Sequence, residues 1–268
     1  MPELPEVETV VTVLKRRILG LTIQNIDIYY DKMMDEDTKT LLIGKTISDI
    51  TRQGKYICFH LNPYVLISHL RMEGRYFFKD IDEPKLKHEH VVFTLSDGLS
   101  LRYHDTRKFG TFDLRHLSDY KVVPPLSQLA DEPFQIDPKA LYKTLKSKHK
   151  AIKTALLDQS IIAGIGNIYA DEILFSTRIN PHRMTSKLTQ KDTTNVVNAA
   201  ILILNQAILS GGTTIRTYVS ELGVSGRFQL KLMVHQREGE HCYVCGGSIV
   251  REVINGRSSF YCKTCQKR

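Results

Sequence analysis

The chain opens Met1-Pro2-Glu3-Leu4-Pro5-Glu6, a terminus whose residue types can do nucleophilic chemistry. Methionine aminopeptidases remove Met before small residues such as proline, and this step would leave Pro2 with a free secondary amine. The reference pKa of such an amine, about 7.7–8.0, leaves roughly a tenth or more of it unprotonated at neutral pH. Attack on a sugar or carbonyl carbon would then form a charged iminium, a strong electron sink. We expect Pro2 to be a nucleophile and Glu3 to shuttle protons; a disordered terminus is the alternative.

Four cysteines near the carboxyl end, Cys242, Cys245, Cys262 and Cys265, form two Cys-x-x-Cys pairs with sixteen residues between them. This spacing is typical of a zinc ribbon, because each pair offers two thiolates to one tetrahedral ion. Four protein ligands leave no coordination position open, so we expect one structural Zn(2+) ion without a catalytic role. Redox-active or merely reduced thiols are the alternative. Cys58 lies in an apolar strand pattern and is expected in the core.

Charge is unevenly distributed along the 268 residues, which carry a net charge of +8 and a sequence pI near 9.1. From Arg227 to Arg268 there are eight Lys or Arg residues and three Glu residues. The segment Lys143 to Lys153 adds five lysines and no acid, although such a run is often only a solvated face. The asymmetry favours a polyanionic partner such as nucleic acid.

Neither a signal peptide nor a membrane span is expected. The longest apolar stretch, Val196 to Leu209, is interrupted by Asn198, Asn205 and Gln206. In an intracellular protein, clustered cysteines indicate a metal site rather than disulfides. We therefore expect a soluble protein of the cytoplasm.

Periodicity predicts the elements that must position these residues. An amphipathic helix is expected from Glu6 to Leu19, ending at Gly20, so that the reactive terminus lies at its positive end. Short β-branched and aromatic runs follow, which favours a sandwich or barrel. The expected strands are Ile23–Tyr30, Thr46–Thr51, Tyr56–Leu61, Tyr64–His69, Arg75–Phe78, His90–Leu95, Leu99–His104 and Thr111–Leu114.

After a proline-rich linker between Asp119 and Asp137, the pattern becomes helical. Helices are expected at Pro138–Lys148, Ile152–Leu157, Asn167–Ser176 and Thr189–Leu209, followed by a polar loop and the cysteine cluster. Gly164 and Gly166 let the backbone before the helix at Asn167 approach a phosphate, which suits DNA phosphate better than a dinucleotide. Asn167 as a simple N-cap is the alternative.

Several short motifs occur in one order along the whole chain, and together they resemble bacterial formamidopyrimidine-DNA glycosylase. They are Pro2-Glu-Leu-Pro-Glu6, Gln53-Gly-Lys55, His69-Leu-Arg-Met72-Glu-Gly74, Asp105-Thr-Arg107-Lys-Phe109-Gly110, Gly164-Ile-Gly-Asn167 and the zinc ribbon. Each motif alone is weak, but their shared order leaves little room for chance.

The resemblance implies an α+β fold: an N-terminal β-sandwich with flanking helices, then a C-terminal helix-two-turn-helix domain with a four-cysteine zinc-finger β-hairpin. We place the catalytic domain at 1–118, a linker at 119–134, the helix-two-turn-helix domain at 135–226 and the zinc finger at 227–268. It also implies a bifunctional enzyme, most simply a monomer at the bacterial nucleoid. This enzyme would excise 8-oxoguanine and formamidopyrimidines from double-stranded DNA and then cleave the strand at the abasic site.

The resemblance assigns the catalytic residues to Pro2, Glu3 and Lys55, with Glu6 either assisting or merely holding the terminus. Flipping the damaged base leaves a hole in the stack, and Met72, Arg107 and Phe109 match the residues that fill it. His69, Lys153, Asn167 and Arg257 match DNA contacts. The lesion pocket would draw on Glu73, Thr214, Arg216 and Tyr218.

Two departures from the family pattern concern the zinc finger. Ser258 and Ser259 follow Arg257 where the family usually has Gly-Thr, and His235-Gln236 replaces a common Tyr-Gly. They leave the catalytic set intact and put only the fine geometry of the finger in doubt.

Two rival interpretations are open. An endonuclease VIII-type glycosylase for oxidised pyrimidines would begin Pro-Glu-Gly-Pro-Glu and lack the Arg-x-Phe pattern, so Leu4, Arg107 and Phe109 argue against it. A non-catalytic zinc-ribbon DNA-binding protein would explain the basic charge equally well, but it gives Pro2, Glu3 and Lys55 no reason to occur together.

Overall fold

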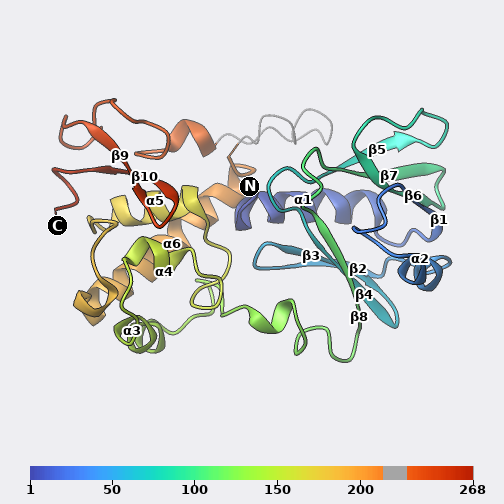
Figure 1. Ribbon diagram of the computed structural model, residues 1–268, viewed down its shortest axis with the longest axis horizontal. Helices are drawn as coiled ribbons and strands as arrows, with labels where there is room; N and C mark the ends of the chain where they lie inside the picture. The colour runs from blue at the N-terminus through green and yellow to red at the C-terminus, as the bar shows by residue number, and fades with distance from the viewer. Residues whose placement is uncertain (214–227, 268) are drawn as a thin grey trace. The chain divides into compact units, whose positions relative to one another are not determined.

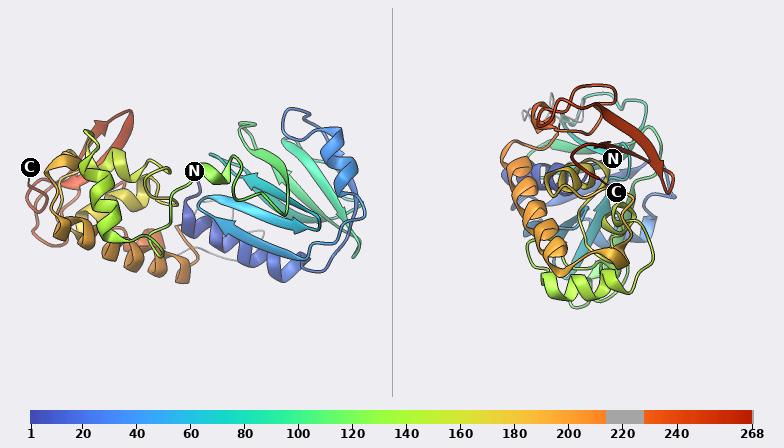
Figure 2. Two further views of the ribbon diagram at one scale, coloured as in Figure 1. Left: turned by 90° about the horizontal axis from the view of Figure 1, so that it is seen from below. Right: turned by 90° about the vertical axis from the view of Figure 1, so that its left-hand side faces the viewer.

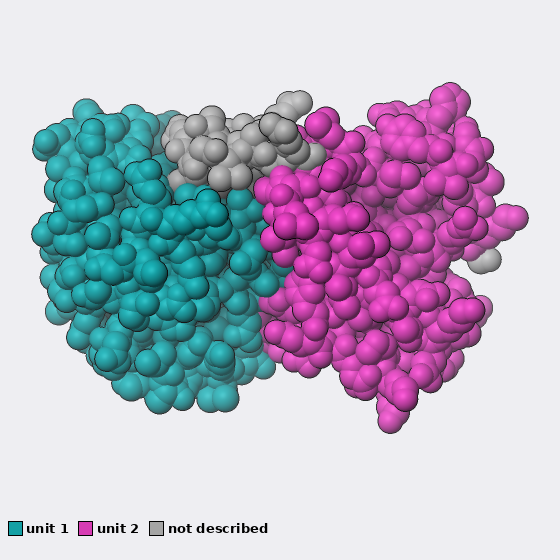
Figure 3. All heavy atoms as spheres, turned by 180° about the vertical axis from the view of Figure 1, so that it is seen from behind, with its two compact units in different colours: residues 1–127, 213–226 teal, residues 128–212, 227–268 magenta. Residues whose placement is uncertain are grey.

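The computed structural model describes residues 1–213 and 228–267, which divide into two compact units (Figure 3). Unit 1 contains residues 1–127 and Thr213, and unit 2 contains residues 128–212 and 228–267. The arrangement agrees with the expected α+β class, with β-sheets first and helices and a cysteine cluster afterwards.

Unit 1 is built on two four-stranded antiparallel sheets, ordered β1-β6-β7-β5 and β2-β3-β4-β8 (Figure 1). All eight expected strands are present, with ends that differ by a few residues at most. Their bounds are β1 Ile23–Ile28, β2 Asp49–Gln53, β3 Tyr56–Leu61, β4 Tyr64–His69, β5 Arg75–Asp80, β6 Glu89–Leu95, β7 Leu99–His104 and β8 Thr111–His116.

Helix α1 (Leu4–Ile18) packs against β2 and β3 through its apolar face (Figures 1 and 2). Val7, Leu14 and Ile18 on this face are at most 1% exposed and belong to the same core cluster as residues of both sheets. The helix begins two residues before the expected start, because Pro5 occupies its first turn, where a missing N–H costs nothing. Gly20, at φ 83°, follows the helix as expected.

A short helix, α2 (Glu36–Leu42), was not expected from the periodicity. Leu42 is its one fully buried residue, so its apolar face is too narrow to produce a 3.6-residue pattern. A local signal does exist, because the Asp35 carboxylate accepts the Thr38 N–H at 2.7 Å as an N-cap.

Unit 2 combines four α-helices with a two-stranded hairpin in its described part (Figures 1 and 2). Three short 3-10 helices complete the described elements of the chain. The bounds are η1 Leu126–Gln128, α3 Pro138–Lys146, α4 Ile152–Leu156, α5 Asn167–Ser176, η2 Thr185–Lys187, α6 Gln190–Leu209, η3 Phe228–Lys231, β9 Ile249–Ile254 and β10 Arg257–Cys262. Helix α5 packs against α6 and β10, which ties the zinc hairpin to the helices.

Candidate active site and nucleic-acid interface

Strand pairing brings three connections of unit 1 to one end of the sheet β2-β3-β4-β8. Tyr56 of β3 lies opposite His69 of β4, and His69 lies opposite Thr111 of β8. Chain segments that adjoin these three residues must therefore lie at the same sheet end. They are the turn at Gly54–Lys55, the loop of residues 70–74 with Met72, and the loop of residues 105–110 with Arg107 and Phe109, here called the wedge loop.

Two ion pairs orient α1 so that its N-terminus points to this same end. Arg52 at the end of β2 contacts Glu8 in the first turns of the helix at 2.7 Å, while Asp49 at the start of β2 contacts Lys15 at 2.8 Å. The helix therefore runs antiparallel to β2. The terminus with Pro2 and the Lys55 turn consequently share one end of the unit.

The expected catalytic terminus is held in place from several sides. Pro2 is buried, Glu3 is 2% exposed and Met1 is 44% exposed. Glu3 is the N-cap of α1, and its N–H donates to Glu6 Oε2 at 2.9 Å within a capping box. The other carboxylate oxygen of Glu6 accepts both the N–H and the hydroxyl of Thr213 at 2.9 Å. The Glu6 carboxylate thus ties the start of α1 to Thr213, while its expected assisting role stays a prediction.

Lys55 stands in a tight turn between β2 and β3. Gly54 before it has φ 57°, a conformation that favours glycine, and its carbonyl accepts a hydrogen bond from Arg52 at 2.9 Å. The side chain of Lys55 is only 5% exposed. Lys55 is thus buried, unlike the solvated lysine that a turn ordinarily carries.

His69 is neutral because burial lowers its pKa to about 3, with the positive charges of Arg71 and Lys55 acting in the same direction. Its Nδ1 accepts the Arg71 N–H at 2.9 Å. The single ring proton of a neutral imidazole then resides on Nε2, which is left as a hydrogen-bond donor. His69 can therefore donate to a phosphate oxygen without carrying charge.

The wedge loop is organised around Asp105, a residue whose role the sequence motif did not specify. Its carboxylate is fully buried and accepts the N–H groups of Arg107, Phe109 and Gly110 at 2.9, 2.9 and 2.8 Å. Lys108 between them has φ 57°. The backbone of the loop is thus folded around one carboxylate.

Of the residues expected to fill the void, Arg107 and Phe109 are exposed and Met72 is half-buried. Phe109 is 51% exposed, and the Arg107 guanidinium lies 4.7 Å from the centre of its ring. The Thr106 hydroxyl donates to the carboxylate of Glu73, the residue directly after Met72. This bond joins the loop that carries Met72 to the loop that carries Arg107 and Phe109. Glu73, expected in the lesion pocket, is thus a link between the two loops here.

In unit 2, the start of α5 is shaped by the glycine-rich turn. Gly164 has φ 89°, Gly166 is the N-cap, and the Gln159 side chain bonds Gly164 N and Ile165 O, both at 2.9 Å. Asn167 is the first helical residue rather than the N-cap. Its amide donates to the Ser258 carbonyl of β10 at 3.0 Å.

Lys153 was expected to contact DNA, but its side chain is 1% exposed. The ammonium donates to Asp171 Oδ1 at 2.6 Å and to the Ser258 carbonyl at 2.9 Å. A carboxylate on α5 and a carbonyl on β10 thus enclose the charge, and the expected DNA contact of Lys153 stays a prediction. No local pattern in the sequence pointed to Asp171 as its partner.

Arg257 is the first residue of β10, directly after the hairpin turn. The turn residues Asn255 and Gly256 have φ 47° and 74°, a pair suited to a two-residue hairpin turn. Arg257 is exposed and pairs across the ladder with Ile254. The hairpin thus presents a guanidinium next to a backbone that unit 2 fixes at Ser258.

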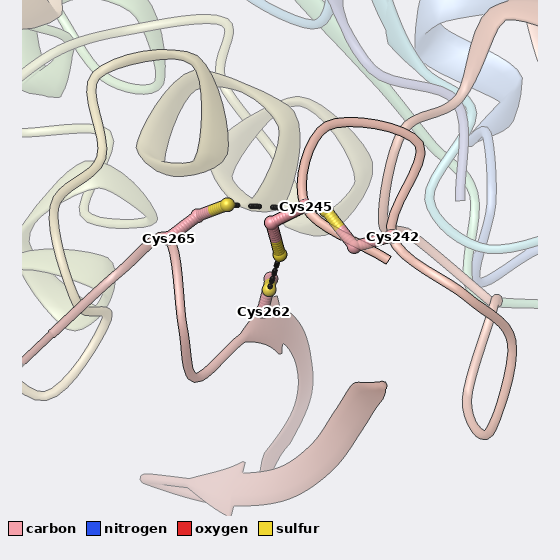
Figure 4. A group of neighbouring side chains, drawn as sticks. All are labelled: Cys242, Cys245, Cys262 and Cys265. Atoms are coloured by element: carbon pink, nitrogen blue, oxygen red, sulfur yellow. Dashed lines mark hydrogen bonds between the residues drawn. The ribbon is translucent and has the colours of Figure 1, made fainter. Parts of the chain in front are cut away.

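The four cysteines converge as the spacing predicted (Figure 4). Their sulfur atoms all lie within 4.8 Å of one another, with Cys242–Cys265 at 3.9 Å and Cys245–Cys262 at 3.5 Å. A Zn–S bond of about 2.3 Å places tetrahedral sulfurs about 3.8 Å apart, so the donor set fits zinc. With four protein ligands, the ion is structural. Cys58 is buried in β3, and burial raises its pKa to about 12.

Three residues expected in the lesion pocket, Thr214, Arg216 and Tyr218, lie outside the described residues. Within the described ranges, no helix combines the length and apolar composition that crossing a membrane requires.

Three family models match the chain in succession. Residues 1–112 match the formamidopyrimidine-DNA glycosylase N-terminal domain, and residues 129–219 match the formamidopyrimidine-DNA glycosylase H2TH domain. Residues 239–268 match a zinc finger found in FPG and IleRS. The third match and the sulfur geometry together assign one structural zinc ion to this protein.

Curated relatives and solved structures agree with these matches over the full chain. The chain is 44% identical to formamidopyrimidine-DNA glycosylase of Bacillus licheniformis and 45% identical to that of Exiguobacterium, with all of both chains covered in each case. Lactococcus lactis Fpg in complex with DNA containing an abasic site is 39% identical, with a TM-score of 0.94 and full coverage of both chains. The same values describe its complex with DNA containing N7-benzyl-Fapy-dG. With its terminal Pro-Glu, its wedge loop and its cysteine cluster placed as described, the chain belongs to the formamidopyrimidine-DNA glycosylase family.

Proposed function

We propose that this protein is a base-excision repair enzyme that flips oxidised purines out of duplex DNA, removes them through Pro2 and then nicks the strand. Relatives named formamidopyrimidine-DNA glycosylase and solved complexes with damaged DNA support this function. The observation that carries it is the gathering of the Pro2 terminus, Lys55 and the wedge loop at one end of unit 1. A non-catalytic DNA-binding protein would need no such gathering.

The reaction begins once Met1 is removed, because the Pro2 nitrogen is otherwise an amide without a usable lone pair. The free amine lies at the N-terminus of α1, where the positive end of the helix dipole favours its unprotonated form. Its nitrogen attacks the sugar C1′ as the bond from C1′ to the base breaks, and the base leaves with a proton. Glu3, beside the nitrogen, is the residue placed to move protons in this step.

Strand cleavage requires the sugar ring to open: the Pro2 nitrogen loses its proton, the C1′–O4′ bond breaks as O4′ takes a proton, and the nitrogen lone pair forms the C=N bond of the iminium. The charge of the iminium acidifies the C2′ proton, and its removal expels the 3′ phosphate by β-elimination. A second elimination expels the 5′ phosphate, and hydrolysis of the remaining iminium by water releases the sugar remnant and regenerates Pro2. Lys55 and neutral His69 are placed at the same end of the sheet to hold phosphates during these steps.

Base flipping leaves a hole in the duplex that Met72, Arg107 and Phe109 are suited to fill. An apolar side chain in the hole opposes restacking, and the Arg107 guanidinium can donate hydrogen bonds to the acceptors of an estranged cytosine. Asn167 and Arg257 supply further DNA contacts from unit 2. We propose that the protein acts as a monomer at the bacterial nucleoid, which light scattering and fluorescence localisation would test.

The experiment that tests the function is reductive trapping. Borohydride added during reaction with an 8-oxoguanine duplex should give a covalent protein–DNA adduct on Pro2, located by mass spectrometry of the peptide. A Pro2→Gly variant should trap much less, whereas Glu3→Gln should bind the duplex normally but excise slowly. Intact mass must first establish that Met1 has been removed from the tested protein. Processed wild-type protein that gives neither adduct nor strand scission would refute the function.

A second substrate separates this function from its rival within the class. An enzyme for oxidised pyrimidines would excise thymine glycol faster than 8-oxoguanine. We expect the opposite order, because Arg107 and Phe109 supply the pattern that such enzymes lack.

A further inference from the structure

Three buried side chains from separate segments of unit 2 form one hydrogen-bonded network. Lys153 on α4 donates to Asp171 Oδ1 on α5 at 2.6 Å, and His235 Nδ1 contacts Asp171 Oδ2 at 2.7 Å. The side chains of Lys153, Asp171 and His235 are 1%, 0% and 6% exposed. The carboxylate therefore has a charged partner on one oxygen and an imidazole on the other.

The same region of α5 also holds the chain around His235. Glu172, the residue after Asp171, accepts the N–H groups of Met233, Val234 and His235 at 2.8, 3.0 and 2.9 Å. The His235 ring packs edge-on against Phe260 of β10, with the ring centres 5.1 Å apart. The segment that leads into the zinc finger is thus fixed to α5 through its backbone and its imidazole.

The network ends at the residue next to Arg257. The Ser258 carbonyl accepts from Lys153 Nζ at 2.9 Å and from Asn167 Nδ2 at 3.0 Å. The Ser258 hydroxyl accepts from the Arg251 Nε and Nη2 groups at 3.1 and 2.9 Å. Since Ser258 follows Arg257 directly, these bonds determine where the hairpin presents the Arg257 guanidinium.

Two side chains reinforce the backbone contact between Lys153 and the Ser258 carbonyl. The His235 imidazole bonds the Asp171 carboxylate that holds Lys153, and the Ser258 hydroxyl accepts from Arg251. The backbone contact itself involves neither of these side chains.

Burying an ammonium and a carboxylate costs more free energy than an apolar pair of the same size would. A buried pair is therefore explained better by the geometry it imposes than by the stability it adds. We propose that Lys153, Asp171 and His235 are positioning residues that hold Arg257 beside Asn167 at the start of α5, and that Lys153 acts on DNA only through them. The inference rests on the proposed function, because it assumes that Arg257 binds a DNA phosphate.

His235→Phe tests the network with little loss of packing, because phenylalanine keeps a ring against Phe260 but has no N–H for Asp171. His235→Asn is the matched control, since its side-chain amide can donate near the position of Nδ1. The probe is a duplex with a tetrahydrofuran abasic analogue, and Kd is measured at several salt concentrations. Zinc content and single-turnover excision of 8-oxoguanine at saturating protein are measured on the same preparations.

We expect His235→Phe to weaken binding about tenfold and to reduce the slope of log K against log salt by about 1, as loss of one phosphate contact does. Zinc content and the saturating excision rate should stay at wild-type values. His235→Asn should stay within about twofold of wild type in Kd. If His235→Phe binds as wild type does, or if the control loses as much affinity, the inference is wrong.

A pair of variants at Lys153 keeps the test decisive if His235→Phe folds poorly. Lys153→Gln with Asp171→Asn removes both charges but keeps an N–H donor for the Ser258 carbonyl, whereas Lys153→Met with Asp171→Asn removes the donor as well. Positioning predicts that the variant with glutamine binds more tightly than the variant with methionine. A direct phosphate contact by the Lys153 charge predicts equal loss in both. Wild-type protein without excision activity would refute the proposed function instead, whichever variants bind.

Discussion

Two loops of this protein present an arginine to solvent, and each is held by one buried carboxylate. In the wedge loop of unit 1, Asp105 accepts three backbone N–H groups at 2.8–2.9 Å. In unit 2, Asp171 bonds Lys153 at 2.6 Å and His235 at 2.7 Å, and Lys153 continues to the hairpin beside Arg257. Backbone N–H dipoles stabilise the negative charge of Asp105, whereas the positive charge of Lys153 compensates that of Asp171.

The difference concerns how far each arginine depends on the rest of the molecule. In the part of the chain that the structure describes, the Asp105 carboxylate bonds only N–H groups within five residues of it, while its peptide groups bond His88 and His90. Asp171 is separated from Lys153 by 18 residues and from His235 by 64, so that contact requires three segments to be packed already. Damage at Asp105 should therefore be local, whereas damage at Asp171 should spread through unit 2.

The largest expected effect is on stability at Asp171. Asp171→Ala leaves the Lys153 ammonium buried without its counter-charge and should lower the free energy of unfolding by about 3–5 kcal/mol. Urea denaturation followed by circular dichroism measures this. The matched control is Lys150→Ala, which breaks a pair with Asp158 at 3.1 Å whose side chains are about one-third exposed, and it should cost less than about 1 kcal/mol. Similar losses in the two variants would contradict the distinction.

Substitution of Asp105 should lower the free energy of unfolding less than Asp171→Ala does. It should nevertheless clearly impair the insertion of wedge-loop side chains into the duplex. Asp105→Asn turns an amide N–H₂ toward backbone N–H groups, leaving at least one donor unsatisfied at a cost of about 2 kcal/mol. Fluorescence of 2-aminopurine opposite the lesion should show reduced unstacking on binding. Asp97→Asn serves as control, because the exposed Asp97 accepts only the Leu99 N–H. If Asp105→Asn unstacks the base opposite the lesion as wild type does, Asp105 is not needed to hold the wedge loop in the conformation that enters the duplex.

In unit 1, burial keeps the His69 imidazole neutral. Its folded pKa of about 3 lies below the ordinary value of 6.5, so below pH 6.5 the unfolded chain binds a proton that the folded protein does not. Stability from this group is complete above pH 6.5 and falls as the pH decreases toward 3. Between pH 7 and pH 5, wild type should lose about 1–2 kcal/mol more than His69→Gln. Parallel pH profiles of the two proteins in urea titrations would contradict the neutral ring.

The smallest effect is expected at the bond between Thr106 and Glu73. Thr106→Val keeps the shape of the side chain and removes the hydroxyl, so stability should change by about 0.5 kcal/mol or less. The preference for excision opposite cytosine should nevertheless weaken, because the loop of residues 70–74 and the wedge loop are then no longer joined by this bond and can move independently. Thr106→Ser should retain the preference. An unchanged ratio of excision opposite cytosine and adenine in Thr106→Val would show that the bond has no such role.

Local chemistry made much of the fold and site predictable. The eight strands of unit 1 follow from runs of β-branched and aromatic residues bounded by turn residues, and the ends of β3, β4 and β7 agree with this pattern. The zinc cluster follows from the Cys-x-x-Cys spacing, since each pair needs only one tight turn. Helix α2 was missed because its one buried residue, Leu42, leaves no periodic signal, although Asp35 offered an N-cap signal.

Charge partners were less predictable. A lysine within a run of five lysines reads as a solvated cation, and nothing near Lys153 in sequence shows that Asp171 neutralises it. Likewise, Glu6 bonds Thr213 across 207 residues, a contact that no spacing rule contains. Such pairings depend on which helix faces pack together, which local propensity does not encode.

Residue types and their spacing established the chemical groups: a proline able to become a free amine, a carboxylate beside it, and four thiolates with zinc spacing. Tertiary structure alone decided which groups meet. Antiparallel pairing of β2, β3, β4 and β8, together with the Glu8–Arg52 and Lys15–Asp49 pairs, brings the Pro2 terminus to Lys55, His69 and the wedge loop. Burial then decided protonation and exposure, because desolvation leaves His69 neutral and close packing encloses Lys153.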